Sequence, residues 1–487
     1  MRKLKKNHNS GVVSLRSRTL VLALLLLSMI AGSAWAEPSA AELKRKLAGV
    51  LREHRVEGAR VGVYIKVLKT GRVISNDGGS EPMIPASNLK VVTTAAALDY
   101  LGPTYRYQTE LLGPRELKDG TLVGNLVLRG SGDPTFCYPY NEPATEPLRQ
   151  FVRVLREQGV RRVVGDVVAD DSAFDRKFLG EGWFDRYILD SYAAPVSALS
   201  LNANLVALNI SQKQIVLDPA SQGVTVENRL TPSSYTDVWV ERKRGDDRIV
   251  VRGTIAPGDV VQRSLTINNP ALFTAGALRD ILSKGGIEVR GGARTVQKNG
   301  EAAAFRQLKT YARYQSPPLL ELINQVNRES DNFFAQHIFK TVGEKYKGLG
   351  TAENAQAAVE DFMRRNHVRC QGLRMVDGSG LSVLNRISPR QLVEVLEAAY
   401  THRHGQEFID SLPAGGEGTM SCRLNGLVVR AKTGTLDGHS ALTGYVVSSY
   451  GQTIAFSILV NNVSGTWRAV ELQDHVVRLL ATWPEPL

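Results

Sequence analysis

The alternation of apolar and polar residues predicts helices and strands near both ends of the chain. The stretch SAAELKRKLAGVLREH, from residue 39, has apolar residues at helical spacing. The next stretch, VGVYIKVLKTGRVISND, alternates on either side of a Lys-Thr-Gly-Arg turn, which predicts a β-hairpin. Pro85 and Ser87 mark a helix start, and Gly102-Pro103 mark a helix end, so we expect a helix over about 87–101.

The middle of the chain has a different character. Short β-rich segments separated by turn residues run from about 109 to 270. Helical patterns then resume in NPALFTAGALRDILSKGG, PPLLELINQVNRESDNFFAQHIFKTVGEK and NAQAAVEDFMRRN. Three alternating stretches, GLVVRAKTG, SALTGYVVSS and QTIAFSILVNN, precede a last amphipathic helix, AVELQDHVVRLLATW. This order predicts an α+β domain built from the two ends of the chain and interrupted by a long insertion.

Residues 1–36 predict a signal peptide that directs export. A basic, acid-free segment precedes an apolar core of about 14 residues, and Ala34-Trp35-Ala36 matches a cleavage signal. We expect cleavage after Ala36, with an uncleaved N-terminal anchor as the alternative. The last residues, WPEPL, form no basic amphipathic extension, so we expect no C-terminal membrane anchor.

Composition indicates a soluble protein and argues against one kind of partner. The chain has 487 residues, of which 43% are hydrophobic and 22% charged, as in soluble proteins of more than one domain. Of its 60 basic side chains six lie in the predicted signal peptide, and 48 residues are acidic, so little net charge remains after cleavage. The chain that remains after cleavage has no basic run interleaved with aromatic residues. We therefore expect no binding of nucleic acid.

The three cysteines, Cys137, Cys370 and Cys422, would enter an oxidising compartment after export. One pair could form a disulfide and leave one thiol over, and the sequence does not choose among the three pairings. No CxxC or HxxxH spacing is present, so we expect no metal site.

Ser87 and Lys90 are the first candidates for chemistry. They are three residues apart at a predicted helix start, so their side chains share one face. A serine hydroxyl needs a base to become a nucleophile, and a lysine can be that base if burial lowers its pKa. Free backbone N–H groups at the helix start can stabilise an oxyanion. A capping serine beside a solvated lysine is the simpler interpretation of this pair alone.

Two further motifs follow in order. Ser330-Asp331-Asn332 lies within a helical pattern, and Lys432-Thr433-Gly434 lies on a predicted strand. A second Lys-Thr-Gly triplet, Lys69-Thr70-Gly71, precedes the serine and falls in the predicted hairpin turn, so we interpret it as a turn only. Gly130-Ser131-Gly132 and Gly378-Ser379-Gly380 do not complete a G-x-S-x-G nucleophile motif, and we expect turns at both.

The three motifs in this order resemble those of the penicillin-recognising serine enzymes. The stretches VLRGSGDPTF, GDVVADDSAFD, APVSALSLNANLVAL, DGSGLSVLNRISP and LPAGGEGTM narrow the resemblance. They are similar to the low-molecular-mass class C penicillin-binding proteins, the D-alanyl-D-alanine carboxypeptidase/endopeptidase family. The similarity runs from about residue 45 to the C-terminus.

This resemblance implies a periplasmic enzyme that hydrolyses peptidoglycan stem peptides ending in D-Ala-D-Ala and needs no cofactor. It implies cleavage of crosslinks between stem peptides as a second activity, and covalent inhibition by β-lactams. Ser87 would be the acylated nucleophile and Lys90 its base. Ser330 would relay a proton to the leaving D-alanine or from water.

The resemblance also implies roles in substrate binding. Asn332 would bind the peptide backbone of the substrate, and Thr433 and Thr435 its terminal carboxylate. Lys432 would supply positive potential that also keeps the pKa of Lys90 low. The backbone N–H groups of Ser87 and Thr435 would form the oxyanion hole.

By the same resemblance, the fold would be a transpeptidase-like α+β domain, also found in β-lactamases, with helices on both sides of an antiparallel sheet. This domain would comprise residues 37–107 and 274–487. Two nested β-rich domains would interrupt it, one formed by 108–131 with 205–273 and the other by 132–204.

A serine β-lactamase and a catalytically silent cell-wall-binding protein of the same fold are the alternatives. Class A β-lactamases use a glutamate in E-x-x-L-N, and here no acidic residue lies three positions before any Leu-Asn pair, at Leu201, Leu208, Leu384 or Leu424. The long interval between Lys90 and Ser330 also exceeds the needs of a bare β-lactamase domain.

Overall fold

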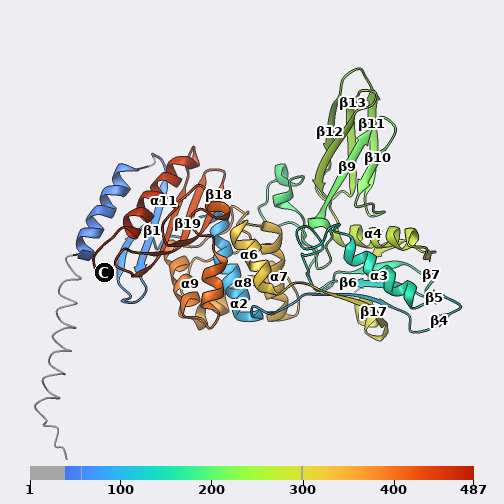
Figure 1. Ribbon diagram of the computed structural model, residues 1–487, viewed down its shortest axis with the longest axis horizontal. Coiled ribbons are helices and arrows are strands. Elements are labelled where there is room, and N and C mark those ends of the chain that lie inside the picture. The colour runs from blue at the N-terminus through green and yellow to red at the C-terminus, as the bar shows by residue number, and fades with distance from the viewer. Residues whose placement is uncertain (1–38, 56, 298–299) are drawn as a thin grey trace, which may run out of the picture.

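The computed structural model describes residues 39–55, 57–297 and 300–487 (Figure 1). One five-stranded sheet lies at one end of the elongated molecule, a group of helices lies beside it, and the strands from the middle of the chain form the other end (Figure 1). The predicted signal peptide lies outside the described residues. Within them, no helix is long and apolar enough to cross a membrane.

The five-stranded sheet joins the two ends of the chain. Its order is β18-β19-β20-β1-β2, and all its pairs are antiparallel. Its strands are β1 (Arg60–Val67), β2 (Val73–Asp77), β18 (Val429–Leu436), β19 (His439–Val447) and β20 (Thr453–Asn461). The hairpin turn between β1 and β2 contains Lys69-Thr70-Gly71, as the alternation predicted.

Helices cover both faces of this sheet, because successive strand residues point to opposite sides. Val63 and Ile65 pack in one hydrophobic cluster with the helix of residues 39–53 and with α11 (Thr466–Ala481). Tyr64 belongs to another cluster, which contains the helices that cover the opposite face. These helices are α2 (Leu89–Leu101), α6 (Leu319–Arg328), α7 (Asn332–Lys347), α8 (Ala352–Arg365), α9 (Pro389–Thr401) and α10 (Gly405–Ser411). The predicted α+β class is therefore confirmed.

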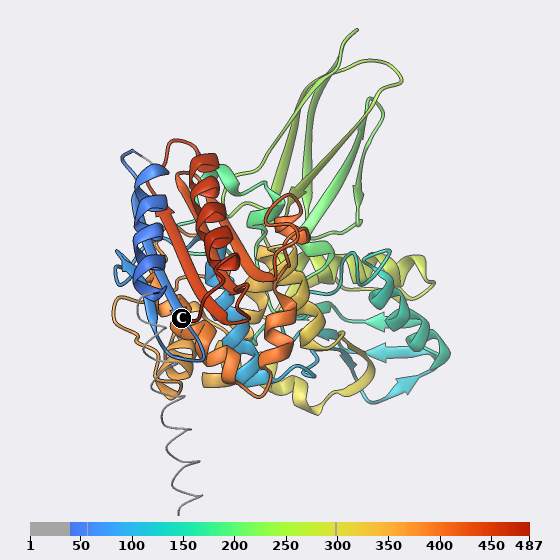
Figure 2. The ribbon, with the colours of Figure 1, turned by 60° about the vertical axis from the view of Figure 1, so that its left-hand side comes forward.

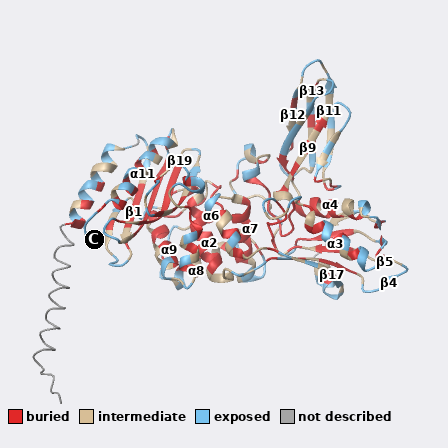
Figure 3. Ribbon diagram, viewed as in Figure 1, coloured by how far each residue is buried: buried red, intermediate tan, exposed pale blue. Residues whose placement is uncertain are grey.

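Helix α2 is the central element of the helical group. Residues 89–98 are all buried, which is expected of a helix that is enclosed on every side rather than amphipathic. Figure 3 shows the buried residues gathered in α2, in its helical neighbours and in the five-stranded sheet. Packing on every side of α2 therefore holds the start of this helix in position.

The strands of the middle segment form four further sheets, which have the orders β16-β8-β6-β3-β17, β15-β7-β5-β4, β10-β9-β14 and β11-β13-β12. Their bounds are β3 (Gln108–Gly113), β4 (Leu117–Lys118), β5 (Thr121–Val123), β6 (Leu126–Arg129), β7 (Arg162–Val164), β8 (Val167–Asp170), β9 (Leu205–Ser211), β10 (Ile215–Asp218), β11 (Thr225–Pro232), β12 (Asp237–Glu241), β13 (Arg248–Ile255), β14 (Val260–Thr266), β15 (Glu288–Val289), β16 (Ala293–Thr295) and β17 (Lys309–Gln315). Helices α3 (Glu146–Glu157) and α4 (Pro270–Lys284) pack beside them, and α5 (Glu301–Ala304) is short. Strands β9 to β14 form an arm that projects from the body (Figure 1).

The boundaries of the inserted domains stay a prediction. Strand pairing bears on the one predicted between residues 273 and 274. Strand β16 pairs with β8, and β17 pairs with β3, although both lie after residue 273. Ile287 and Tyr311 also belong to the core of the middle segment. We propose that the chain returns to the helical part near residue 316 rather than near 274.

The structure divides one predicted helical pattern into two helices. Helix α6 ends at Arg328 and α7 begins at Asn332. Between them Ser330 has a φ of 61°, which lies outside the right-handed helical region. The Asp331 side chain accepts a hydrogen bond from Phe334 N (3.0 Å) and so caps α7. Asp331 is a local signal for the start of a helix, because aspartate is a preferred N-cap residue. The apolar periodicity continues across the break, and it predicted a single helical segment instead.

All three cysteines are free within the described chain. Cys137 is buried, Cys370 is half-buried and Cys422 is exposed. None of the three pairings that the sequence left open is formed.

Candidate active site

Ser87 and Lys90 meet at the start of α2. A short 3-10 turn, η1 (Ala86–Asn88), leads directly into the helix, and Lys90 lies one helical turn after Ser87. The Nζ atom of Lys90 is 2.9 Å from Ser87 Oγ. Ser87 is half-buried, whereas Lys90 is completely buried. The pair predicted from its spacing is therefore in direct contact.

Two further acceptors hold the lysine amine in place. Lys90 Nζ donates to Asn332 Oδ1 (2.6 Å) and to the carbonyl oxygen of Ser379 (2.7 Å). A carbonyl oxygen can only accept a hydrogen bond, so both contacts use an N–H of the lysine. A neutral amine has two N–H groups and one lone pair. In that state both N–H groups are engaged, and the lone pair is left for the hydroxyl proton of Ser87.

Burial prepares Lys90 for this role. Desolvation lowers the pKa of Lys90 from 10.5 to about 7, against the opposing effect of the carboxylates of Asp377 and Asp331. A substantial fraction of the side chain is therefore neutral near pH 7. Burial and repulsion by Lys432 were both expected to lower the pKa of Lys90, and burial is the main cause.

The Ser330-Asp331-Asn332 motif lies opposite the start of α2. Asn332, the first residue of α7, also donates from Nδ2 to the carbonyl oxygen of Tyr192 (2.9 Å). Burial raises the pKa of Asp331. Ser330 lines the same cavity as Ser87 and Asn332. The positive φ of Ser330 thus lies at the site, where such strained conformations are common.

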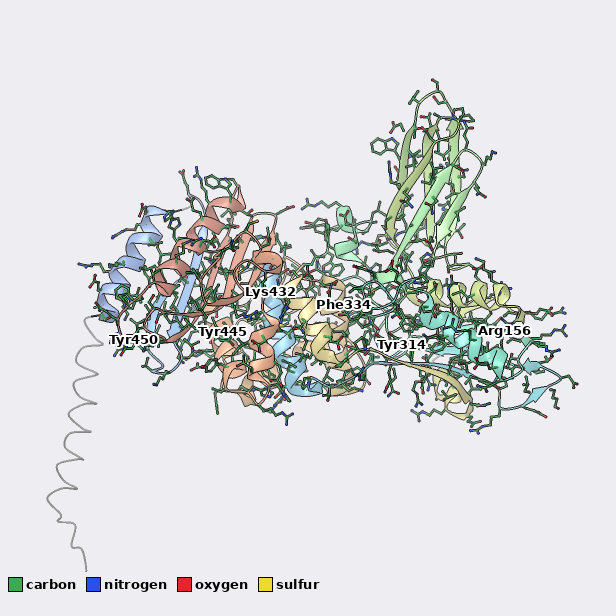
Figure 4. All side chains as sticks on the ribbon, in the orientation of Figure 1. Arg156, Tyr314, Phe334, Lys432, Tyr445 and Tyr450 are labelled. Atoms are coloured by element: carbon green, nitrogen blue, oxygen red, sulfur yellow. The ribbon has the colours of Figure 1, made fainter. Side chains whose placement is uncertain are left out.

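Strand β18 forms the other wall. Lys432 is completely buried, and both burial and repulsion from Lys90 lower its pKa. Its Nζ atom donates to the carbonyl oxygen of Thr433 (3.0 Å), and Thr433 Oγ1 donates to Thr419 Oγ1 (2.7 Å). Figure 4 labels Lys432 where the five-stranded sheet meets the helices. The predicted motif residues thus come from three separate elements around one point.

The N–H of Thr435 points toward the site. Strand β18 is the edge strand of its sheet, and Ala431 N donates away from the sheet to Pro413 O (3.1 Å). Alternate residues of an antiparallel strand direct their N–H groups to the same side. Because the register of β18 with β19 is regular, the N–H groups of Thr433 and Thr435 also point away from β19. This geometry leaves the Thr435 donor available to a ligand.

Gly434 allows β18 to approach the nucleophile closely. A Cβ atom at this position would lie 3.0 Å from both Ser87 N and Pro85 O. The strand and the start of α2 could not keep their present separation with any larger residue. The glycine of the triplet is therefore required by the distance between two elements, and not by its own backbone conformation.

A cavity of about 640 Å³ opens at this point. Ser87, Ser330, Asn332 and Thr435 line it, while Lys90 and Lys432 are buried and are not part of its lining. Leu436 and Asp437, the two residues after the Lys-Thr-Gly-Thr strand segment, line it as well. Thr433 is not part of the lining, and its hydroxyl is bonded to Thr419 instead.

The sequence interpretation missed two contributions. The Gly378-Ser379-Gly380 turn supplies the carbonyl oxygen that fixes Lys90, and a Cβ at Gly380, whose φ is +83°, would lie 1.9 Å from Ala86 O. Tyr187 and Tyr192, from the middle segment, line the cavity opposite β18. The side chain of Arg186 forms an ion pair with Asp437 (2.6 Å). No local pattern marks these contacts, because they depend on segments distant in sequence.

Comparisons with known proteins agree with the geometry. The model of the D-Ala-D-Ala carboxypeptidase 3 (S13) family matches residues 43–483. A D-alanyl-D-alanine carboxypeptidase from Actinomadura sp. (strain R39) is 30% identical, over 99% of this chain and 93% of that protein. The D-alanyl-D-alanine carboxypeptidase DacB of Haemophilus influenzae is 27% identical, over 84% of this chain and 86% of its own. The crystal structure of penicillin-binding protein 4 (dacB) from Haemophilus influenzae has a TM-score of 0.75 at 26% identity and covers 90% of this chain and 99% of its own. The likeness extends over the middle segment as well as the helices and sheet that form the site.

Proposed function

The chain belongs to the D-Ala-D-Ala carboxypeptidase 3 (S13) family, and from this premise we propose that it hydrolyses peptidoglycan stem peptides through an acyl-enzyme on Ser87. The observation that carries the proposal is the contact between Lys90 Nζ and Ser87 Oγ at 2.9 Å. Both other directions of the amine are occupied by acceptors, so its lone pair faces the nucleophile.

Acylation begins when neutral Lys90 takes the hydroxyl proton of Ser87 as Oγ attacks the carbonyl carbon between the two D-alanines. The N–H groups of Ser87 and Thr435 stabilise the oxyanion. The C–N bond then breaks, and the amine of the departing D-alanine takes a proton through Ser330. Water, deprotonated by the same groups, attacks the ester and releases the shortened peptide. β-Lactams acylate Ser87 by the same route.

Substrate binding uses the wall formed by β18. Thr433 and Thr435 hold the terminal carboxylate, and Lys432, buried behind them, contributes positive potential. Asn332 already bonds Lys90 and Tyr192 in this structure, and the second N–H of its amide is left for the substrate backbone. Leu436 and Asp437 contact the side chain that precedes D-Ala-D-Ala.

We also propose export to the periplasm, with cleavage near Ala36, and cleavage of peptide crosslinks as a second activity. Both rest on the sequence pattern and on the family resemblance. A solved form of penicillin-binding protein 4 (dacB) from Haemophilus influenzae, at a TM-score of 0.72 and 25% identity, is complexed with a β-lactam, which supports β-lactams as ligands here.

Digestion of defined muropeptides tests both hydrolytic activities. We expect pentapeptide monomers to lose one D-alanine, and tetra-pentapeptide dimers to give monomers, because both reactions release an amine from a D-alanyl carbonyl. Chromatography with mass detection measures the products. If neither substrate changes, the proposed function is wrong; if only the monomer changes, the crosslink activity is wrong. Rapid turnover of penicillin, without either reaction, would support the alternative of a serine β-lactamase.

We expect Gly434→Ala to slow acylation of Ser87 by about tenfold to a hundredfold, because the added Cβ displaces β18 from the start of α2. The rate of labelling by a fluorescent penicillin measures this effect, and circular dichroism checks the fold. Gly49→Ala is the matched control, since no atom of the described residues lies within 4 Å of a Cβ at Gly49. Equal labelling rates in the two variants would contradict the proposed close approach.

A further inference from the structure

Two helices lie side by side on the face of the five-stranded sheet that is turned away from α2. They are the helix of residues 39–53 and α11 (Figures 1 and 2). Leu43 and Leu47 of the first helix share a hydrophobic cluster with Leu472 and Val476 of α11. The residue after the first helix, His54, is thereby brought to the exposed side of α11.

His54, Glu471 and His475 form a compact group there. Their ligand atoms, one from each side chain, all lie within 4.8 Å of one another. The rings of His54 and His475 stack with their centroids 3.9 Å apart. Glu471 and His475 are one helical turn apart on α11, so they project from the same face. His54 is half-buried and the other two are exposed, which leaves the group open to ions from solvent.

A backbone carbonyl determines which nitrogen of His475 is free. His475 Nδ1 lies 2.9 Å from the carbonyl oxygen of Glu471, which can only accept a hydrogen bond. Nδ1 therefore carries the proton, and the lone pair is on Nε2. Metal-binding histidines commonly have this arrangement, in which the second nitrogen donates to a carbonyl and orients the ring.

In the part of the chain that the structure describes, the other two ligand groups have no competing partner. Among the described residues, neither the Glu471 carboxylate nor the His54 ring makes a hydrogen bond or ion pair to another side chain beyond the stacking contact. Two imidazole nitrogens and one carboxylate oxygen form a ligand set that zinc prefers, with water as the fourth ligand. Exposed side chains can rotate enough to reach one ion at about 2 Å from each ligand.

We propose that His54, Glu471 and His475 bind one zinc ion, which links the N-terminal helix to α11. The site is separate from the cavity at Ser87, none of whose lining residues belongs to it. We expected no metal site because the sequence contains no CxxC or HxxxH spacing. His54 lies near the N-terminal end of the chain, whereas Glu471 and His475 lie on α11, and only the packing of the two helices brings the three ligands together.

Titration of the mature, tag-free chain with zinc chloride tests the proposal. After treatment with EDTA and its removal, isothermal calorimetry near pH 7.5 is expected to show one ion bound per chain. His54→Ala and His475→Ala should each weaken binding by about tenfold or more, and Glu471→Gln should also weaken it. Zinc at a hundredfold excess over its Kd should raise the Tm of the wild type by about 3 °C, and that of His475→Ala not at all.

His367→Asn is the matched control, because His367 is exposed and distant in sequence from all three ligands, and asparagine tolerates its positive φ. It should bind zinc as the wild type does. Penicillin labelling should be unchanged in His475→Ala, which shows that the variant is folded. The proposal is overturned if the wild type binds no zinc, or if His475→Ala binds it with unchanged affinity.

Discussion

Ser87→Ala is expected to eliminate covalent labelling by a fluorescent penicillin and to slow release of D-alanine by about a thousandfold or more. The Oγ atom of Ser87 is the atom that forms the ester, and it is the only hydroxyl that contacts Lys90 Nζ among the contacts in the described chain. Ser330 lines the same cavity but is not bonded to the lysine. Removing Ser87 Oγ therefore removes the nucleophile without providing another one.

Gel fluorescence and mass spectrometry of the labelled protein measure this effect. Ser131→Ala is the matched control, because it removes a serine from the Gly130-Ser131-Gly132 turn. There, among the described residues, Oγ accepts a hydrogen bond only from Gln108 N. The control should label at the rate of the wild type. An adduct found on Ser330 or Ser379, or labelling that survives in Ser87→Ala, would show that the assigned nucleophile is wrong.

Lys90→Met should slow acylation by about a hundredfold to ten-thousandfold, because methionine fills the buried space but cannot accept the Ser87 proton. The wild type should also show an inflection in its acylation rate near pH 7. The base is active only when neutral, so the rate should fall about tenfold for each pH unit below the pKa, and level off above it. A lysine with the ordinary pKa of 10.5 would give a rate that still rises at pH 9.

Stopped-flow acylation between pH 5.5 and 9.5 gives the profile, and the inflection should be absent from any residual rate of Lys90→Met. Lys69→Met is the matched control, since it alters the lysine of the exposed first Lys-Thr-Gly triplet. Thermal melts distinguish lost chemistry from lost structure, because the substitution leaves Asn332 Oδ1 and Ser379 O without their donor. A flat wild-type profile through pH 7 would contradict Lys90 as the base.

Much of the catalytic half of the fold could be predicted from periodicity. The strands β18, β19 and β20 follow the alternation of their residues, and α2 follows the start signals at Pro85 and Ser87. The contact between Ser87 and Lys90 needed only the helical spacing of three residues. These features depend on residues that are close together in the sequence, so the sequence is enough to predict them.

The helical pattern around Ser330 shows where periodicity misleads. Apolar residues recur at helical spacing on both sides of the motif, yet the chain turns at Ser330 and a new helix begins after Asp331. Asn332, the first residue of the new helix, accepts a hydrogen bond from Lys90 Nζ. A capping aspartate competed with the apolar pattern, and the tertiary contacts of both helices decided the outcome.

The sequence by itself determined the order of the three motifs, the helix that carries Ser87 and Lys90, and the strand that carries Lys432 to Thr435. Only the tertiary structure decided which atoms surround the lysine amine, since Asn332 and Ser379 come from segments far along the chain. Only the tertiary structure, likewise, places Tyr192 at the cavity and brings His54 next to Glu471 and His475. The physical reason is that a pKa near 7 and a ligand cluster both depend on burial and proximity, which arise only when distant segments pack together.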